Sequence, residues 1–201
     1  MKTLIIIDPQ NDFMPGGPLA VPDGDAIIPV INRMQDRFDL VVATQDWHPV
    51  THESFAANHS GKQPFEQISL HGIEQTLWPV HCVQGTLGAE FHRDLNQRPV
   101  AAIFRKGMNP ALDSYSGFYN NDHTTSTGLA GYLREMGAGK LYFSGLCADI
   151  CVYFTIKDAL REGFECCLIE DATCPLNEDH YQVIKTELLA KGVDFVESIS
   201  V

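Results

Sequence analysis

Positively charged residues are scarce in this chain, and the marks of several protein classes are missing. Only 14 Lys and Arg stand against 26 Asp and Glu, which gives a formal net charge of −12. A nucleic acid is therefore not an expected partner, because proteins that bind a phosphate backbone carry a basic surface. No apolar run approaches the roughly 18 residues of a membrane-spanning helix, so no membrane association is expected. Internal repeats and low-complexity segments are also missing.

The six cysteines form neither a recognisable disulfide framework nor a Cys-x-x-Cys redox pair. Cys166 and Cys167 are adjacent within an apolar run, which indicates buried, reduced thiols and a cytoplasmic location. The apolar stretch near the amino terminus, residues 4–7, ends at Asp8 and is too short for a secretory signal. We interpret it as a buried first strand.

The chain does contain a regular alternation of short apolar segments and helical ones. Apolar runs predict strands at 3–7, 40–44, 100–104, 141–145, 164–171 and 194–198. Helical spacing and stop signals predict helices at 25–38, 125–139, 148–163 and 179–192. Such alternation predicts an α/β fold, a Rossmann-like, three-layer α/β/α arrangement around a mostly parallel six-stranded sheet. The length fits one domain that covers residues 1–201.

Residues 46–98 interrupt this alternation with a long excursion that is rich in His, Pro and Gly. Loops of that length in a compact domain are usually functional. In parallel sheets, ligands bind beyond the carboxyl ends of the strands. The first candidates for a site are therefore the residues that follow the predicted strands: Asp8, the segment 46–48, Arg105 with Lys106, and the segment 147–151.

Two thiols, Cys147 and Cys151, compete for the role of nucleophile. We expect Cys151 in the first turn of a helix that Asp149 begins, where unpaired N–H groups favour a thiolate and lower the thiol pKa. Cys147 precedes that helix and gains less. A thiol that attacks a carbonyl also needs a partner for its proton, and Asp8 and Lys106 are the candidates at the same edge. Taken singly, each of these residues is more often structural.

Asp46 and His48 stand two residues apart on an extended segment, so their side chains are expected to point the same way. His81 lies in a turn-like segment of the same excursion. One carboxylate and two imidazoles suit Zn²⁺, Mn²⁺ or Fe²⁺ and leave positions open for water or substrate. The remaining histidines are interpreted as surface or packing residues, with His52 as a rival ligand: His52, His59, His71, His92, His123 and His180.

Aromatic residues also gather near these segments. Phe13 and Tyr115 lie in loops rich in Gly, Pro, Asn and Ser, where an aromatic side chain can form the wall of a pocket. Trp47 and Trp78 lie beside the candidate metal ligands in the sequence. Aromatic walls suit a flat aromatic substrate.

Five segments, taken together and in this order, resemble the nicotinamidases of the isochorismatase-like hydrolase superfamily: "IIIDPQNDFMPGG", "ATQDWHP", "WPVHCVQGT", "FRKG" and "SGLCADICV". The resemblance covers nearly the whole chain and implies an isochorismatase-like hydrolase fold. Three features depart from the common pattern. Pro9 stands where valine is common, Ile150 precedes the matching cysteine where some relatives carry an aromatic residue or histidine, and the segment after Lys106 varies in length.

The resemblance implies a role for each matching position. The matching catalytic residues are Asp8, Lys106 and Cys151. The matching metal ligands are Asp46, His48 and His81. Ser54 matches a further ligand position, direct or through water, ahead of Glu53 and His52. Phe13, Trp78 and Tyr115 match positions that contact the substrate ring. A cis peptide at Leu146–Cys147 is also implied, together with an oxyanion hole made by the backbone N–H groups of Cys147 and Cys151.

The activity implied by the resemblance is hydrolysis of nicotinamide to nicotinate and ammonia in NAD salvage, with pyrazinamide as a second substrate. The implied cofactor is a divalent metal, zinc first, with iron and manganese as alternatives. The expected partner is this small molecule, and a homo-oligomer is left open. Four alternatives remain: an N-carbamoylsarcosine amidase-like enzyme, an isochorismatase proper, a metal-binding protein without turnover, and a thiol redox protein. Cys151 counts against the second, which needs no thiol, and the cysteine spacing counts against the fourth.

Overall fold

A six-stranded sheet forms the centre of the computed structural model, which describes all residues 1–201. Its strands are β1 (Lys2–Ile7), β2 (Leu40–Asp46), β5 (Val100–Lys106), β6 (Lys140–Leu146), β7 (Glu165–Cys174) and β8 (Asp194–Val196). They lie in the order β5-β2-β1-β6-β7-β8, and every neighbouring pair is parallel. The predicted six strands and the predicted sheet are therefore confirmed, with the sheet parallel throughout.

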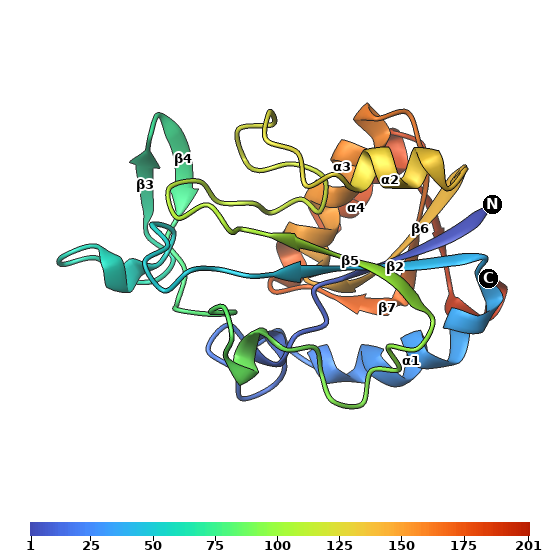
Figure 1. Ribbon diagram of the computed structural model, residues 1–201, viewed down its shortest axis with the longest axis horizontal. Coiled ribbons are helices and arrows are strands. Elements are labelled where there is room, and N and C mark those ends of the chain that lie inside the picture. Colours follow the sequence, from blue (N-terminus) through green and yellow to red (C-terminus); the bar gives the residue numbers. More distant parts are fainter.

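Helices cover both faces of this sheet. The helix α1 (Ile27–Met34) lies on one face, and α2 (Leu129–Glu135), α3 (Tyr153–Arg161) and α4 (Glu178–Ala190) lie on the other (Figure 1). In β1, Leu4 and Ile6 belong to the core beneath α1, whereas Ile5 and Ile7 belong to the core beneath α2, α3 and α4. Successive side chains of a strand point to opposite faces, so a strand buried on both faces is apolar at every position. This explains the continuous apolar run that predicts β1.

Several predicted helix boundaries are wrong. Of the segment predicted as helix at 25–38, only α1 is α-helical, with short 3-10 turns on either side. Residues 125–128 lie outside α2, because the Thr127 backbone N–H donates to the Phe118 carbonyl and Gly128 has a positive φ of 92°. The segment predicted as one helix at 148–163 begins with a π-helical turn, Ala148–Val152, before α3.

The excursion after β2 contains a hairpin that the sequence reading does not predict. Strands β3 (Gln67–Leu70) and β4 (Ile73–Thr76) pair antiparallel across a two-residue turn. Both turn residues, His71 and Gly72, have positive φ angles, of 50° and 85°. Two-residue hairpin turns favour this backbone conformation, which glycine adopts easily. The hairpin stands at the carboxyl end of the sheet, far from both chain termini (Figure 1).

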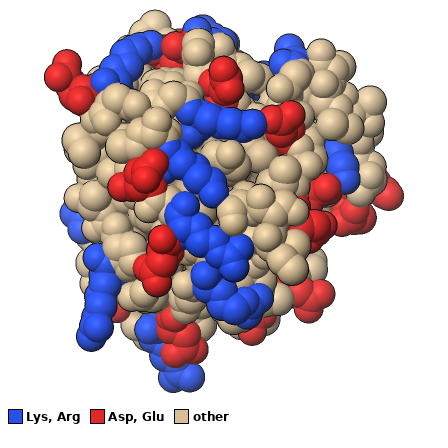
Figure 2. Space-filling model, turned by 90° about the vertical axis from the view of Figure 1, so that its right-hand side faces the viewer, with Lys and Arg blue, Asp and Glu red and all other residues tan.

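The opposite end of the molecule, where the strands begin, carries closely mixed charges. Figure 2 shows Lys and Arg side chains across the middle of this face with Asp and Glu side chains beside them. At the start of β6 and β8, for example, Lys140 Nζ lies 2.5 Å from a carboxylate oxygen of Asp194. None of the helices combines the length and the apolar character that crossing a membrane requires.

Candidate active site and metal site

Three chemically distinct side chains meet where the central strands end. Asp8 directly follows β1, Lys106 ends β5, and Cys151 lies in the π-helical turn that follows β6. All three are buried. The Lys106 ammonium lies 2.9 Å from Asp8 Oδ2 and 3.6 Å from Cys151 Sγ. A carboxylate oxygen of Asp8 and the Cys151 sulfur lie within 4.8 Å of each other. We refer to Asp8, Lys106 and Cys151, the predicted catalytic residues, as the catalytic trio.

Hydrogen bonds fix the side chains of Lys106 and Asp8. Lys106 Nζ donates to Asp46 Oδ1 at 2.5 Å and to the Ser114 carbonyl at 3.0 Å. The Thr44 hydroxyl donates to Asp8 Oδ1 at 2.6 Å. Asp8 Oδ2 contacts the Lys106 ammonium at 2.9 Å and has no other polar partner.

Burial and charge together set the protonation states of the catalytic trio. Burial raises the pKa of Asp8, and Lys106 opposes this only in part. Burial alone lowers the pKa of Lys106, but Asp46, Asp8 and Cys151 outweigh it and hold the pKa well above its ordinary value. Burial also raises the pKa of Cys151, and Lys106 does not offset it, so this pKa lies well above that of an ordinary thiol. The resting site thus holds an ammonium and a neutral thiol.

The expectation of a lowered Cys151 pKa is wrong in this structure, because complete burial outweighs the neighbouring Lys106 ammonium. The expected role of Asp149 also differs: its carboxylate oxygens accept the backbone N–H groups of Leu176 and Asn177 at 2.7 and 2.9 Å. Asp149 therefore ties the loop before α4 to the turn that carries Cys151.

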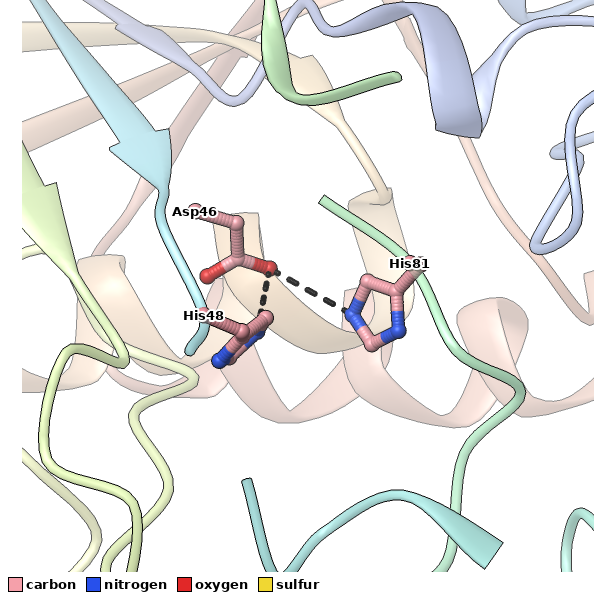
Figure 3. A group of neighbouring side chains, drawn as sticks. All are labelled: Asp46, His48 and His81. Carbon is pink, nitrogen blue, oxygen red and sulfur yellow. Dashed lines mark ion pairs between the residues drawn. The ribbon is translucent and has the colours of Figure 1, made fainter. Parts of the chain in front are cut away.

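A carboxylate and two imidazoles form a second cluster beside the catalytic trio. Figure 3 shows one Asp46 oxygen facing both His48 and His81. The distances from Asp46 Oδ2 are 3.5 Å to His48 Nε2 and 3.7 Å to His81 Nε2. One potential ligand atom from each residue lies within 4.8 Å of the others, and all three residues are buried. We refer to Asp46, His48 and His81 as the metal trio; the structure bears out their predicted convergence.

Backbone carbonyls orient both imidazoles of the metal trio. His48 Nδ1 lies 2.9 Å from the Gly107 carbonyl, and His81 Nδ1 lies 2.8 Å from the Pro79 carbonyl. A ligating histidine usually donates its second ring N–H in this way, which leaves the first nitrogen for the metal. Gly107 has a φ of 66°, and a Cβ there would lie 2.3 Å from His48 Cε1. The donor set and its surroundings thus fit a divalent ion.

His52 and Ser54 are both candidates for a further ligand position. His52 lies against the His48 ring, and Ser54 contacts His52. The His52 ring packs on the His48 ring with 4.5 Å between centroids. His52 Nδ1 lies 2.7 Å from the Ser54 hydroxyl, whereas His52 Nε2 is buried without a hydrogen-bond partner. Burial, and then the neighbouring His48, lower the pKa of His52 to about 4. Asp113, which the sequence reading missed, groups with His48 and His52 within 4.8 Å.

A cavity opens beside these clusters, with Cys151 and all three residues of the metal trio in its wall. Its walls include all three aromatic residues that the resemblance implies, Phe13, Trp78 and Tyr115, together with Cys147 and Cys151. Trp78 and Tyr115 lie edge to face, with 6.0 Å between ring centroids. An apolar cavity with a few polar groups on one side is the usual form of a small-molecule site.

The turn before the nucleophile also has the implied backbone geometry. The Leu146–Cys147 peptide is cis. Burial raises the pKa of Cys147, whereas the backbone N–H groups of Cys151 and Cys147 both act on this sulfur in the opposite sense. Both N–H groups therefore lie close to the Cys147 sulfur.

Comparison with known proteins assigns the chain to a family. The isochorismatase domain family matches residues 2–199. This chain belongs to the isochorismatase domain family. A nicotinamidase of Acinetobacter baylyi is 48% identical over 196 residues, which are 97% of this chain and 92% of the relative.

Solved structures agree with this assignment. A nicotinamidase and pyrazinamidase of Acinetobacter baumannii superimposes with a TM-score of 0.96 at 48% identity, over 99% of this chain and 97% of that chain. A pyrazinamidase of Pyrococcus horikoshii, solved in complex with zinc, superimposes with a TM-score of 0.81 at 37% identity, over 98% of each chain. The isochorismatase-like fold expected from the resemblance is confirmed.

Proposed function

We propose that this protein is an amide hydrolase that converts nicotinamide to nicotinate and ammonia in NAD salvage, and that it also hydrolyses pyrazinamide. The observation that carries the proposal is the placement of a thiol, an ammonium and a carboxylate within a few ångströms of one another, beside the metal trio. High identity to nicotinamidases along nearly the whole chain supports the same activity. A redox role is disfavoured by the spacing of Cys147 and Cys151, which do not form a Cys-x-x-Cys pair.

The first half of the proposed reaction forms a thioester. The Cys151 sulfur bonds to the amide carbonyl carbon while its proton passes to Asp8, whose raised pKa makes it a suitable acceptor. The oxyanion that forms accepts hydrogen bonds from the backbone N–H groups of Cys147 and Cys151. Donors of this kind contribute roughly 3–4 kcal/mol each in other enzymes that catalyse acyl transfer. The C–N bond then breaks, and Asp8 returns the proton to the departing ammonia.

The second half of the reaction consumes one water. Water adds to the thioester carbonyl while Asp8 accepts its proton, and the C–S bond breaks to release nicotinate. Asp8 gives the proton back to the Cys151 sulfur, which restores the resting thiol. Throughout the cycle, Lys106 supplies the fixed positive charge that offsets the charge moving between Asp8 and Cys151.

The ring pocket and the metal trio would orient the substrate. Phe13, Trp78 and Tyr115 form the walls of the cavity in which the flat ring would lie. The metal trio would hold a divalent ion, for which we propose zinc, with iron and manganese as alternatives. When bound, such an ion offers a Lewis acid to the ring nitrogen of the substrate. We propose Ser54, acting through a water, as the further ligand, ahead of Glu53 and His52.

Comparison of wild type with Cys151→Ala tests the proposed function. The assay is ammonia release from nicotinamide, and the expected loss in kcat is at least about a thousandfold, because the covalent route is removed. Cys147→Ser serves as the matched control and should keep most of the activity, since its role is assigned to its backbone. Equal rates for wild type and Cys151→Ala would end the proposal.

Some expectations concern the protein beyond its site. We propose that residues 1–201 act as one domain, that the protein is cytoplasmic, and that nucleic acids and membranes are not among its partners. A homo-oligomer remains an open alternative. Size-exclusion chromatography with light scattering is the direct measurement of that state.

A further inference from the structure

A second hollow, open to solvent, lies beside the cavity described above. The two spaces share four wall residues: Trp78, Tyr115, Ile150 and Leu176. Neither the metal trio nor Cys151 lines the outer hollow. Trp78, Tyr115, Ile150 and Leu176 therefore form a boundary common to both spaces, and the reacting groups lie on the inner side of it.

A row of aromatic side chains runs from one side of the shared wall to the other. Phe65 lies edge to face with Trp78 at 6.1 Å between centroids, and Trp78 lies edge to face with Tyr115. Tyr115 in turn lies 5.3 Å from Phe154. Of the two spaces, Phe65 and Phe154 line the outer hollow and not the inner cavity. Such a row offers ring faces and edges to an apolar or aromatic group.

Phe65 is held in a costly conformation at the rim of this hollow. Its φ is 72°, in the left-handed region that bulky residues rarely adopt, and its N–H donates to the Leu77 carbonyl at 2.6 Å. Its side chain is nevertheless 59% exposed. Backbone outliers of this kind cost about 1–3 kcal/mol and gather at ligand sites. The strained backbone keeps the apolar Phe65 ring exposed to solvent. An exposed ring at the rim of a hollow is well placed to contact a ligand.

The proposed function fixes which part of a substrate would face the outer hollow. A pyridine-3-carboxamide would be held at its ring nitrogen and at its carboxamide carbon. Ring position 5 is meta to both atoms and points away from both. Because the metal trio and Cys151 line only the inner cavity, position 5 would face the wall shared with the outer hollow.

We propose that the outer hollow is a substrate subsite, and that this enzyme accepts pyridine-3-carboxamides with an aromatic or apolar substituent at ring position 5. This inference rests on the proposed function. Phe65 and Phe154 are its specificity-determining residues. Substituents at position 6 have no such space, because they lie next to the ring nitrogen and face the metal trio.

Two isomers of equal size test the subsite. Ammonia release is measured with nicotinamide, 5-phenylnicotinamide and 6-phenylnicotinamide in the metal-loaded enzyme. We expect kcat/KM for the 5-phenyl isomer within about tenfold of nicotinamide. For the 6-phenyl isomer we expect a value lower by about a hundredfold or more, because displacing the ring by about 1 Å misaligns the carbonyl. Equal rates for the two isomers, or a 5-phenyl isomer that is not hydrolysed, would overturn the proposal.

Phe65→Gly tests the residue that carries the proposal. Glycine adopts the φ of position 65 without strain, so the variant loses the ring and keeps the backbone. We expect kcat/KM for 5-phenylnicotinamide to fall by about tenfold, since one aromatic contact is lost. Turnover of nicotinamide should stay within about twofold. Val183→Ala, at another exposed apolar side chain, is the matched control and should change neither rate.

The outcomes separate the two proposals. If nicotinamide releases no ammonia, the proposed function fails. If nicotinamide is hydrolysed but Phe65→Gly lowers the rates for nicotinamide and 5-phenylnicotinamide equally, or lowers neither, only the subsite fails.

Discussion

The catalytic trio and the metal trio lie side by side but are held together by different means. The catalytic trio contains its own cation, since Lys106 stands between Asp8 and the Cys151 sulfur. The metal trio contains only potential metal ligands, and carbonyls of neighbouring loops orient its imidazoles. The first cluster therefore contains a positive charge of its own. The second contains none, and its ligand atoms suit a divalent ion.

Asp46 joins the two clusters. One of its oxygens accepts from Lys106, and the other faces His48 and His81. Burial raises the pKa of Asp46, but Lys106 and His48 outweigh it and keep the pKa well below its ordinary value. Asp46 is thus an anion available to a metal at neutral pH. The comparison predicts that removing Lys106 damages both clusters, whereas removing the metal damages only one.

The largest effect is expected from Lys106→Met. The substitution leaves Asp8 and Asp46 buried without their shared cation, so the free energy of unfolding should fall by about 3–5 kcal/mol in urea titrations. Turnover of nicotinamide should be lost as well. Adding Asp8→Asn removes one uncompensated carboxylate and should restore part of the stability but none of the turnover. If Lys106→Met alone were as stable as wild type, the assigned charge balance would be contradicted.

Removal of the divalent ion should have the next largest effect. At a free zinc concentration about 100 times the Kd, binding should stabilise the fold by about 2.7 kcal/mol. A chelator should remove that stabilisation and stop nicotinamide turnover. His81→Ala should lose the zinc-dependent part of the unfolding free energy and change little in the presence of chelator. The same zinc-dependent stabilisation in His81→Ala would place the metal elsewhere.

Gly107→Ala should act on the metal trio alone. The added Cβ meets the His48 ring, so we expect zinc affinity to fall by about 10–100-fold, as for other losses of support around a metal ligand. Gly72→Ala is the matched control, because Gly72 also has a positive φ but open space around its Cβ. Competition with a chromogenic chelator measures both affinities. Equal affinities in the two variants would show that Gly107 does not support His48.

The sequence predicts the positions of Asp8, Asp46 and Lys106 because they depend on one rule. Parallel strands joined by helices end at the same edge of a sheet, so the residues that follow them must meet. The convergence of Asp46, His48 and His81 also follows from spacing and from the return of the excursion to that edge. Local pattern and topology are sufficient for this part of the site.

Other features depend on contacts that sequence patterns do not encode. Asp149 looks like a helix cap, but its carboxylate bonds the N–H groups of residues far along the chain. The raised Cys151 pKa follows from how completely the tertiary structure buries the thiol. The support that Gly107 gives His48 could have been suspected from the sequence, since a glycine directly after Lys106 indicates close packing or a positive φ.

Identification of the residue that becomes acylated tests the central claim most directly. Enzyme quenched with acid during turnover of nicotinamide is digested, and fragmentation of the peptide with residues 147–151 locates any nicotinoyl group. We predict a nicotinoyl thioester on Cys151 in wild type and in Cys147→Ser, and none in Cys151→Ala. A nicotinoyl group on Cys147, or full turnover by Cys151→Ala, would contradict the account.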